Sequence, residues 1–177
     1  MSYVVRPWAL RDLKDVMRLI RVSSGWKRNR TLREWSCPGV VATVLREDGF
    51  GMDPKFGCLV AEVPPDQRSK DGHTVVGYQF HYFSYCTWKG RIVFGEDLYV
   101  MPEFRGKGIG TSLLSQVAKL ALAHGCSQFR FVLANWNQPA MALYEKLGAI
   151  NVTARDNWVV WHIEGRAMQE LAERVTQ

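Results

Sequence analysis

A glycine-rich loop between an expected strand and an expected helix constrains this sequence more than any other feature. The β-rich run 91–101 leads through Pro102 into Arg105-Gly-Lys-Gly-Ile-Gly110, and apolar residues at helical spacing begin at Thr111. The first amide N–H groups of a helix have no partner inside it, and glycines let a ligand approach the backbone closely. Because Arg105 and Lys107 add positive charge, the segment is predicted to bind phosphate.

The glycine spacing excludes two common phosphate-binding loops. A Walker loop needs Ser or Thr directly after its lysine, but Gly108 follows Lys107. A dinucleotide-binding loop needs the pattern G-x-G-x-x-G, whereas the glycines here stand at 106, 108 and 110. The pattern [Gln/Arg]-x-x-Gly-x-[Gly/Ala] remains, matched by Arg105, Gly108 and Gly110. Such a short match is weak by itself, and a plain surface loop is its alternative.

The hydrophobic pattern predicts one α/β (α+β) domain over residues 1–177, with helices flanking a mixed, mostly antiparallel, twisted sheet. Expected strands cover 3–6, 58–63, 74–85, 91–101, 128–134 and 158–163. Expected helices cover 10–23, 39–47, 111–124, 139–148 and 166–176. No internal repeat or low-complexity tract divides the chain, so we expect no domain boundary.

Composition narrows the classes of partner. Lys and Arg number 23 against 17 Asp and Glu, and this net charge of +6 suggests an anionic partner. No apolar run approaches the ~20 residues that span a bilayer, and the N-terminus lacks a signal-peptide pattern. The cysteines at 37, 58, 86 and 126 and the four histidines show no metal-ligand spacing. We therefore expect a cytoplasmic protein with reduced cysteines, no metal and no membrane contact. The sequence matches no nucleic-acid-binding motif, so we also expect no nucleic-acid partner.

With its context, the glycine loop resembles that of the GCN5-related N-acetyltransferase (GNAT) superfamily. The strand before the loop, the helix after it, the Asn-rich stretch 134–137 and Tyr144-x-x-x-Gly148 all match that family. The resemblance extends over nearly the whole chain to the spermidine/spermine and thialysine acetyltransferase branch. The stretches shared with that branch are Arg6-Pro7, 48–51, 58–64, 72–77, Tyr82-Phe83, Trp88 and Glu96-Asp97.

The resemblance implies acetyl-CoA as cosubstrate and a sheet that splays near its site. Backbone amides of Leu98 to Val100 would hold the pantetheine arm, and the glycine loop would hold the pyrophosphate. The implied acetyl-CoA-binding residues are Leu98, Tyr99, Val100, Arg105, Gly106, Lys107, Gly108, Ile109, Gly110, Thr111, Asn137 and Tyr144.

Acetyl transfer to an amine also needs proton transfer. An alkylamine has a pKa near ~10.4, so at neutral pH a base must remove its proton. The resemblance implies Glu96 as this base, acting through water, and Tyr144 as the general acid that protonates the leaving thiolate. A core tyrosine is the alternative reading of Tyr144. Since strand residues alternate in direction, Glu96 and Asp97 are expected to face opposite sides of the sheet.

The sequence pattern leaves more than one amine substrate open. The resemblance implies that Glu96 and Asp97 contact the amine, and a solvent-facing strand edge is the alternative for this pair. The Trp88 ring could face the ammonium group, or it could be a turn aromatic that closes the core. Asp156 places an acidic residue near the far end of the substrate site. However, Trp26-Lys-Arg-Asn-Arg30 is basic where polyamine enzymes of this branch are acidic, and Gly95 replaces a larger apolar residue. A lysine-like amine carrying a carboxylate suits a site that includes Trp26 and Lys27 better than spermidine does. A solvated surface loop is the alternative for the basic run.

Three function classes stay open at this point. The favoured one is acetylation of a small amine, diamine-like or lysine-like, by a homodimer, the usual assembly of the branch. The others are an inactive acyl-CoA-binding regulatory module and an acetyltransferase that acts on protein lysines.

Overall fold

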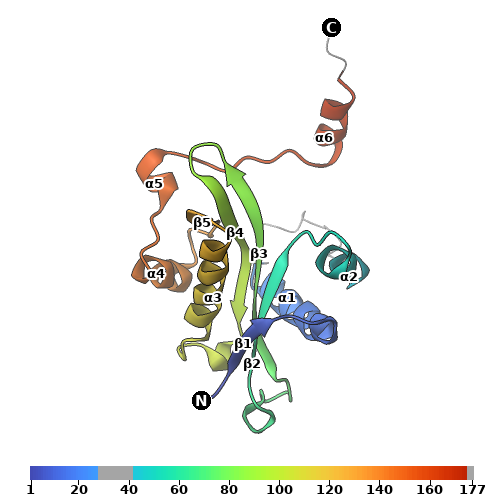
Figure 1. Ribbon diagram of the computed structural model, residues 1–177, viewed down its shortest axis with the longest axis vertical. Helices are drawn as coiled ribbons and strands as arrows, with labels where there is room; N and C mark the ends of the chain where they lie inside the picture. The colour runs from blue at the N-terminus through green and yellow to red at the C-terminus, as the bar shows by residue number, and fades with distance from the viewer. Residues whose placement is uncertain (28–41, 175–177) are drawn as a thin grey trace. The chain divides into compact units, whose positions relative to one another are not determined.

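A computed structural model describes residues 1–27 and 42–174, without the side chains of 24–27 (Figure 1). The chain forms two compact units, Met1–Val132 and Leu133–Gln177. Each unit is described below by itself.

The first unit is built on a five-stranded sheet whose spatial order follows the chain, β1-β2-β3-β4-β5. The strands are β1 (Val4–Pro7), β2 (Gly57–Glu62), β3 (Val75–Cys86), β4 (Gly90–Val100) and β5 (Gln128–Phe131). The first three pairings are antiparallel, while β4 and β5 run parallel. A parallel pair needs a long crossover connection, and the helix after the glycine loop supplies it. This mixed, mostly antiparallel sheet with flanking helices is the predicted fold class.

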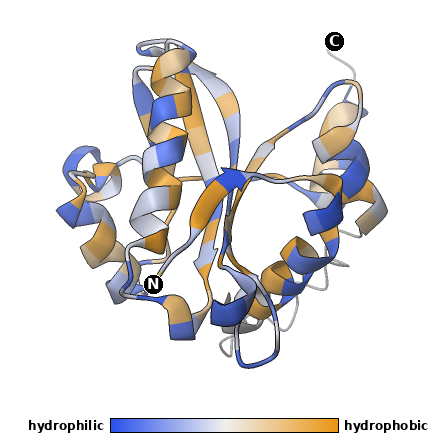
Figure 2. Cartoon of the chain, turned by 60° about the horizontal axis from the view of Figure 1, so that its bottom comes forward, coloured by the Kyte–Doolittle hydropathy of each residue, from blue (hydrophilic) through white to orange (hydrophobic). Residues whose placement is uncertain are grey.

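Helices cover both faces of this sheet. They are α1 (Leu13–Lys27), α2 (Ala42–Phe50) and α3 (Ile109–Ala123), with short 3-10 turns η1 (Leu10–Asp12), η2 (Pro65–Gln67) and η3 (Pro102–Phe104). One core joins α3 to the sheet through residues such as Leu113, Val117 and Val93. A second core joins α1 and α2 to the other face through Val16, Tyr78 and other residues. Figure 2 shows both apolar and polar residues along each helix, as expected of helices with one buried face.

The second unit contains α4 (Gln138–Lys146), α5 (Val152–Asp156) and α6 (Gly165–Ala172). The strand expected over 158–163 is wrong: these residues form no strand, and Trp161 is 88% exposed. Bulky side chains favour strands only when a neighbouring strand supplies pairing and packing, and none of the described strands pairs with this segment. The unexpected helix α5 begins at Val152 and is capped by Asn151, whose side chain accepts a hydrogen bond from the Ala154 amide at 3.0 Å.

The remaining elements differ from expectation mainly at their ends. β5 stops at Phe131, three residues before its expected end. The expected helix over 39–47 begins, as far as the described residues go, at Ala42. Across the described ranges, no helix is both long and apolar enough to cross a membrane.

Candidate functional site

An irregular pairing in β4 places the two adjacent carboxylates. Asp97 pairs with Phe80 of β3, and Gly95 pairs with His81, the next residue along β3. Glu96 is therefore an extra residue in β4 with no opposite residue, which makes it a β-bulge. Bulges redirect side chains and are frequent beside active sites. The Glu96 side chain is exposed, and that of Asp97 is half-buried.

The bulge interrupts the alternation of sides at Glu96 and Asp97. Asp97 accepts a hydrogen bond from Tyr78, which belongs to the core under α1 and α2. The pKa of Tyr82 is raised by burial and, to a smaller extent, by the negative charge of Glu96. Tyr82 points to the same side of the sheet as Tyr78, because β3 alternates regularly between them. The expectation that Glu96 and Asp97 face opposite sides depends on regular alternation, and the extra residue interrupts that alternation at this point.

Asp97 is held by a neighbour that the pattern did not reveal. The Tyr78 hydroxyl donates to Asp97 Oδ2 at 2.5 Å, and the Tyr78 side chain is fully buried. Burial and the charge of Asp97 raise the pKa of Tyr78 far above its usual value, while a hydrogen bond with Ser23 of α1 opposes that rise. Tyr78 is thus a neutral donor that fixes one oxygen of the Asp97 carboxylate.

The outer edge of β4 opens directly at the bulge. β5 pairs with β4 only from Ile92 to Gly95, opposite Gln128 to Phe131. Among the described strands, none continues this pairing along Glu96–Val100. The backbone of Leu98 to Val100 therefore borders a gap in the sheet, as the expected splay requires. Within that gap one carbonyl has a side-chain partner, because Arg105 Nε donates to the Val100 oxygen at 2.8 Å.

The glycine loop has the backbone that close approach of a phosphate needs. Gly106 and Gly108 adopt φ angles of +71° and +83°, a left-handed conformation that residues with a Cβ rarely adopt. A Cβ at Gly106 would meet nothing within 4 Å, so the loop surface is open there. Gly108 is the N-cap of α3, and no described side chain caps this helix. The first-turn amides of a 15-residue helix thus fit a bound anion such as a pyrophosphate.

The two charged residues of the loop also have contacts within the protein. The Arg105 guanidinium lies 5.5 Å from the centre of the Tyr99 ring, besides its bond to Val100. The Lys107 ammonium donates to the Glu103 carbonyl at 3.0 Å and lies 5.2 Å from the centre of the Phe104 ring. The Arg105 side chain therefore contacts the end of β4, and the Lys107 side chain contacts η3.

Three predicted site residues lie in the second unit. Asn137 caps α4, because its side-chain oxygen accepts from the Ala140 amide at 3.4 Å. Tyr144 lies in the last turns of α4 and is half-buried. Asp156 ends α5 and accepts two hydrogen bonds from Arg155, at 2.7 and 2.6 Å. These bonds lower the pKa of Asp156 and neutralise much of its charge, which weakens it as a binder of cations.

Two predicted substrate residues remain. Trp88 lies in the turn between β3 and β4 and is 80% exposed. Trp26 lies in the last turn of α1 together with Lys27, and the side chains of both lie outside the described residues. Of the basic run, residues 28–33 are outside the described part of the chain.

The structure adds a buried polar pair behind the bulge. Gln79 and His81 are both nearly inaccessible, and His81 Nδ1 lies 2.8 Å from Gln79 Oε1. Burial lowers the pKa of His81, so its neutral form is favoured. A Cβ at Gly95 would lie 2.8 Å from the Phe129 ring, so a larger residue at this position would require the ring to move. In the sequence, the only indication of this buried pair is that two polar residues stand within an otherwise apolar strand pattern.

Comparisons with known proteins agree with this geometry. Residues 29–149 match the sequence model of the acetyltransferase (GNAT) family. Thialysine N-epsilon-acetyltransferase of Mus musculus is 45% identical over 163 residues, covering 92% of this chain and 93% of the mouse protein. The human spermidine/spermine N(1)-acetyltransferase-like protein 1 is 30% identical over 161 residues. The aligned region covers 91% of this chain but only 22% of the human protein.

A solved structure shares the fold. An integron cassette protein from the mobile metagenome of V. cholerae superposes with a TM-score of 0.71 at 20% identity, covering 98% of this chain and 99% of that protein. At this identity the likeness establishes the fold alone, whereas the family match and the mouse relative establish ancestry. The chain therefore belongs to the GNAT family, in the branch that holds the thialysine and spermidine/spermine enzymes, and is an N-acetyltransferase.

Proposed function

We propose that the protein transfers the acetyl group of acetyl-CoA to the primary amine of a small lysine-like compound such as thialysine. One observation carries the proposal: the bulge at Glu96 gathers two carboxylates on the strand that leads directly into the open glycine loop. Carboxylates favour an ammonium group, and the loop favours phosphate. The strand and the loop that follows it thus present groups suited to both substrates of an N-acetyltransferase.

Acetyl-CoA fits the residues that this chain provides. The uncapped start of α3 and the glycines at 106 and 108 would hold its pyrophosphate. The open edge of β4 at Leu98 to Val100 would hold the pantetheine arm by backbone hydrogen bonds. Arg105, Lys107, Ile109, Gly110, Thr111 and Asn137 complete the proposed set. When bound, acetyl-CoA supplies the acetyl thioester.

Two side chains would move the protons. Glu96, exposed at the bulge, would accept a proton from the substrate ammonium through water, which frees the nitrogen lone pair. As the new C–N bond forms and the C–S bond breaks, the Tyr144 hydroxyl would give its proton to the departing sulfur. The second proton that the acylated nitrogen loses would pass through water and restore the Tyr144 hydroxyl. Asp97, oriented by Tyr78, would hold the ammonium beside Glu96. Trp88 and Asp156 are further substrate contacts in this proposal.

The choice of a lysine-like amine rests on two supports. Identity is 45% with the mouse thialysine enzyme but 30% with the human relative named for polyamines. The sequence also carries Lys27, Arg28 and Arg30 where polyamine enzymes of the branch are acidic. Positive charge there would attract the carboxylate of an amino acid and repel a polyamine.

A turnover assay across amines tests the proposal. The release of CoA from acetyl-CoA is measured with thialysine, lysine, hydroxylysine, spermidine, short diamines and a lysine-containing peptide. We expect the highest kcat/KM with thialysine or a close amino-acid analogue. A clear preference for spermidine would overturn the substrate, and a preference for the peptide would make the protein a lysine acetyltransferase. No turnover with any amine, together with tight CoA binding, would make it an acyl-CoA-binding module.

Tyr144→Phe tests the general acid. Removal of the phenolic proton should lower kcat about 100-fold while the variant still binds acetyl-CoA. The matched control is Tyr85→Phe, since Tyr85 is 72% exposed in β3 and has no proposed role. Equal kcat in Tyr144→Phe and the wild type would remove Tyr144 from the mechanism.

The two compact units are proposed to act as one catalytic domain over residues 1–177, because the family match at 29–149 crosses their boundary at Val132. Homodimer formation and a cytoplasmic location are further proposals that rest on the resemblance to the branch. Light scattering of the purified protein decides the first, and imaging of a tagged chain decides the second.

A further inference from the structure

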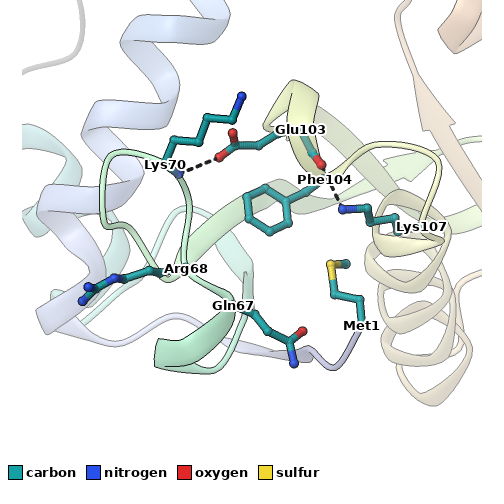
Figure 3. Close-up of a pocket in the computed structure, with 7 residues that line it drawn as sticks. All are labelled: Met1, Gln67, Arg68, Lys70, Glu103, Phe104 and Lys107. Carbon is teal, nitrogen blue, oxygen red and sulfur yellow. Dashed lines mark hydrogen bonds between the residues drawn. The ribbon is translucent and has the colours of Figure 1, made fainter.

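An open pocket of about 340 Å³ borders the glycine loop on the side of the β2–β3 connection (Figure 3). Its walls come from three separate segments of the first unit: the N-terminus, the loop after η2, and η3 with the start of the glycine loop. Lys107 belongs both to this pocket and to the glycine loop. A ligand on the loop therefore has this pocket as its immediate neighbour.

Hydrogen bonds between the segments hold the pocket in shape. The Ser2 amide donates to the Gln67 side chain at 2.9 Å, which fixes the N-terminus. The Lys70 amide donates to Glu103 Oε1 at 3.3 Å, and the Lys107 ammonium donates to the Glu103 carbonyl at 3.0 Å. Glu103 thus joins two walls, and its carboxylate faces the backbone of the β2–β3 connection.

The connection between β2 and β3 presents its positive charges from a fixed turn. Ser69 is buried, and its hydroxyl accepts from the His73 amide at 3.0 Å while its own amide donates to the His73 carbonyl at 2.8 Å. Arg68 and Lys70 flank this anchor and are exposed. Figure 3 shows both side chains on the rim, with their charged ends directed outward. With Lys107, three cationic side chains and one carboxylate surround the pocket.

We propose that the rim of this pocket binds the phosphate monoester on the ribose of CoA, with Arg68 and Lys70 as its main ligands. The inference rests on the proposed function, because it takes acetyl-CoA as the cosubstrate. CoA carries a pyrophosphate and, one ribose away, a separate phosphate monoester. The glycine loop suits the first group, and the adjoining basic pocket suits the second. Arg68 and Lys70 are long side chains on an open rim, so they can reach a phosphate that lies at the mouth of the pocket.

Direct binding tests the inference without any turnover. Isothermal titration of the wild type with CoA and with 3′-dephospho-CoA compares ligands that differ only in the phosphate monoester. We expect CoA to bind roughly tenfold more tightly, which is the effect of two exposed ion pairs within their usual range of strength. The difference should shrink as salt is raised.

A double variant assigns the effect to the pocket. Arg68→Ala with Lys70→Ala should weaken CoA binding roughly tenfold and leave 3′-dephospho-CoA binding unchanged. The matched control is Lys14→Ala with Arg46→Ala, which removes the same charge from exposed positions on α1 and α2. This control should bind both ligands like the wild type.

Each outcome decides one question. Equal affinity of the wild type for the two ligands would overturn the inference and leave the proposed function intact. Equal weakening of both ligands by the double variant would also overturn it, because it would show a general loss of charge or of fold. If neither ligand binds the wild type, the inference and the proposed cosubstrate both fail.

Discussion

The two halves of β4 differ in ways that explain how one strand serves both fold and site. The first half, up to Gly95, pairs with β3 on one side and β5 on the other, and Ile92 and Val93 are buried. The second half, from Glu96 to Val100, pairs with β3 but lies beyond the last residue of β5. The carboxylates, the open backbone and the path to the glycine loop all belong to this second half.

The difference shows that one residue, Glu96, separates the well-paired part of β4 from the part whose outer edge is open. The extra residue at Glu96 changes which face the following side chains occupy, and the end of β5 exposes one backbone edge. The well-paired first half holds the strand in place, so the second half presents its groups from a fixed support. Changes on either side of the bulge should therefore have different consequences.

The largest effect should come from Glu96→Gln in the second half. Loss of the proposed base should lower kcat/KM for the amine about 100-fold near neutral pH, since only the rare neutral amine would then react. The thermal midpoint should stay unchanged, because the side chain is exposed. Steady-state kinetics and a thermal scan measure both quantities.

The control for this variant is Glu47→Gln on the exposed side of α2, which should behave as the wild type. If Glu96→Gln retained full kcat/KM, the substrate ammonium would lose its proton to another group, and Glu96 would have no role in catalysis.

The next largest effect should come from Gly95→Val, which changes the residue at the boundary between the two halves of β4. A side chain there would meet the Phe129 ring, whose nearest atom lies 2.8 Å from the Cβ position. Overpacking of this kind costs about 2 kcal/mol of unfolding free energy, measured by urea denaturation.

Addition of Phe129→Ala tests the cause. The double variant should recover about 1 kcal/mol relative to the sum of the two single changes, because the clash is removed. Strict additivity would show that Gly95 matters for a reason other than Phe129.

A smaller effect is expected from Tyr78→Phe, which removes the support of Asp97 from the neighbouring strand. Loss of the buried hydrogen bond should cost about 1 kcal/mol of unfolding free energy. The KM for the amine should rise while the KM for acetyl-CoA stays constant, because only the orientation of Asp97 changes. Tyr85→Phe on the exposed end of β3 is the control, and a rise in both KM values would point to a general distortion of β4.

The smallest effect concerns pH and His81, the partner of Gly95. Burial lowers the pKa of His81 in the folded protein, so the unfolded chain takes up this proton more readily. The resulting stability is fully present above the unfolded pKa of about 6.5 and is lost as the pH falls through the folded value.

The midpoint of urea denaturation should therefore decrease between pH 7 and more acidic pH. His81→Gln should show a shallower decrease over the same range, because the titrating group is gone. Parallel curves for the two proteins would show that other groups cause the acid sensitivity.

Much of the fold could be predicted because hydrophobic spacing records which face of an element is buried. The periods of α1 and α3 and the β-rich runs of β2 to β4 are visible without any tertiary information. The segment 158–163 shows where this reasoning fails. Its pattern favours a strand, but a strand also needs a partner, and side-chain composition does not specify one.

The sequence by itself determined the family, the glycine loop and the identity of the carboxylates, because these depend on residue types and local spacing. Only the tertiary structure decided that Glu96 is an extra residue in β4, that Tyr78 holds Asp97, and that Phe129 fills the space beside Gly95. These facts depend on strand register, and apolar residues on both sides of the bulge leave no alternation that would reveal the shift.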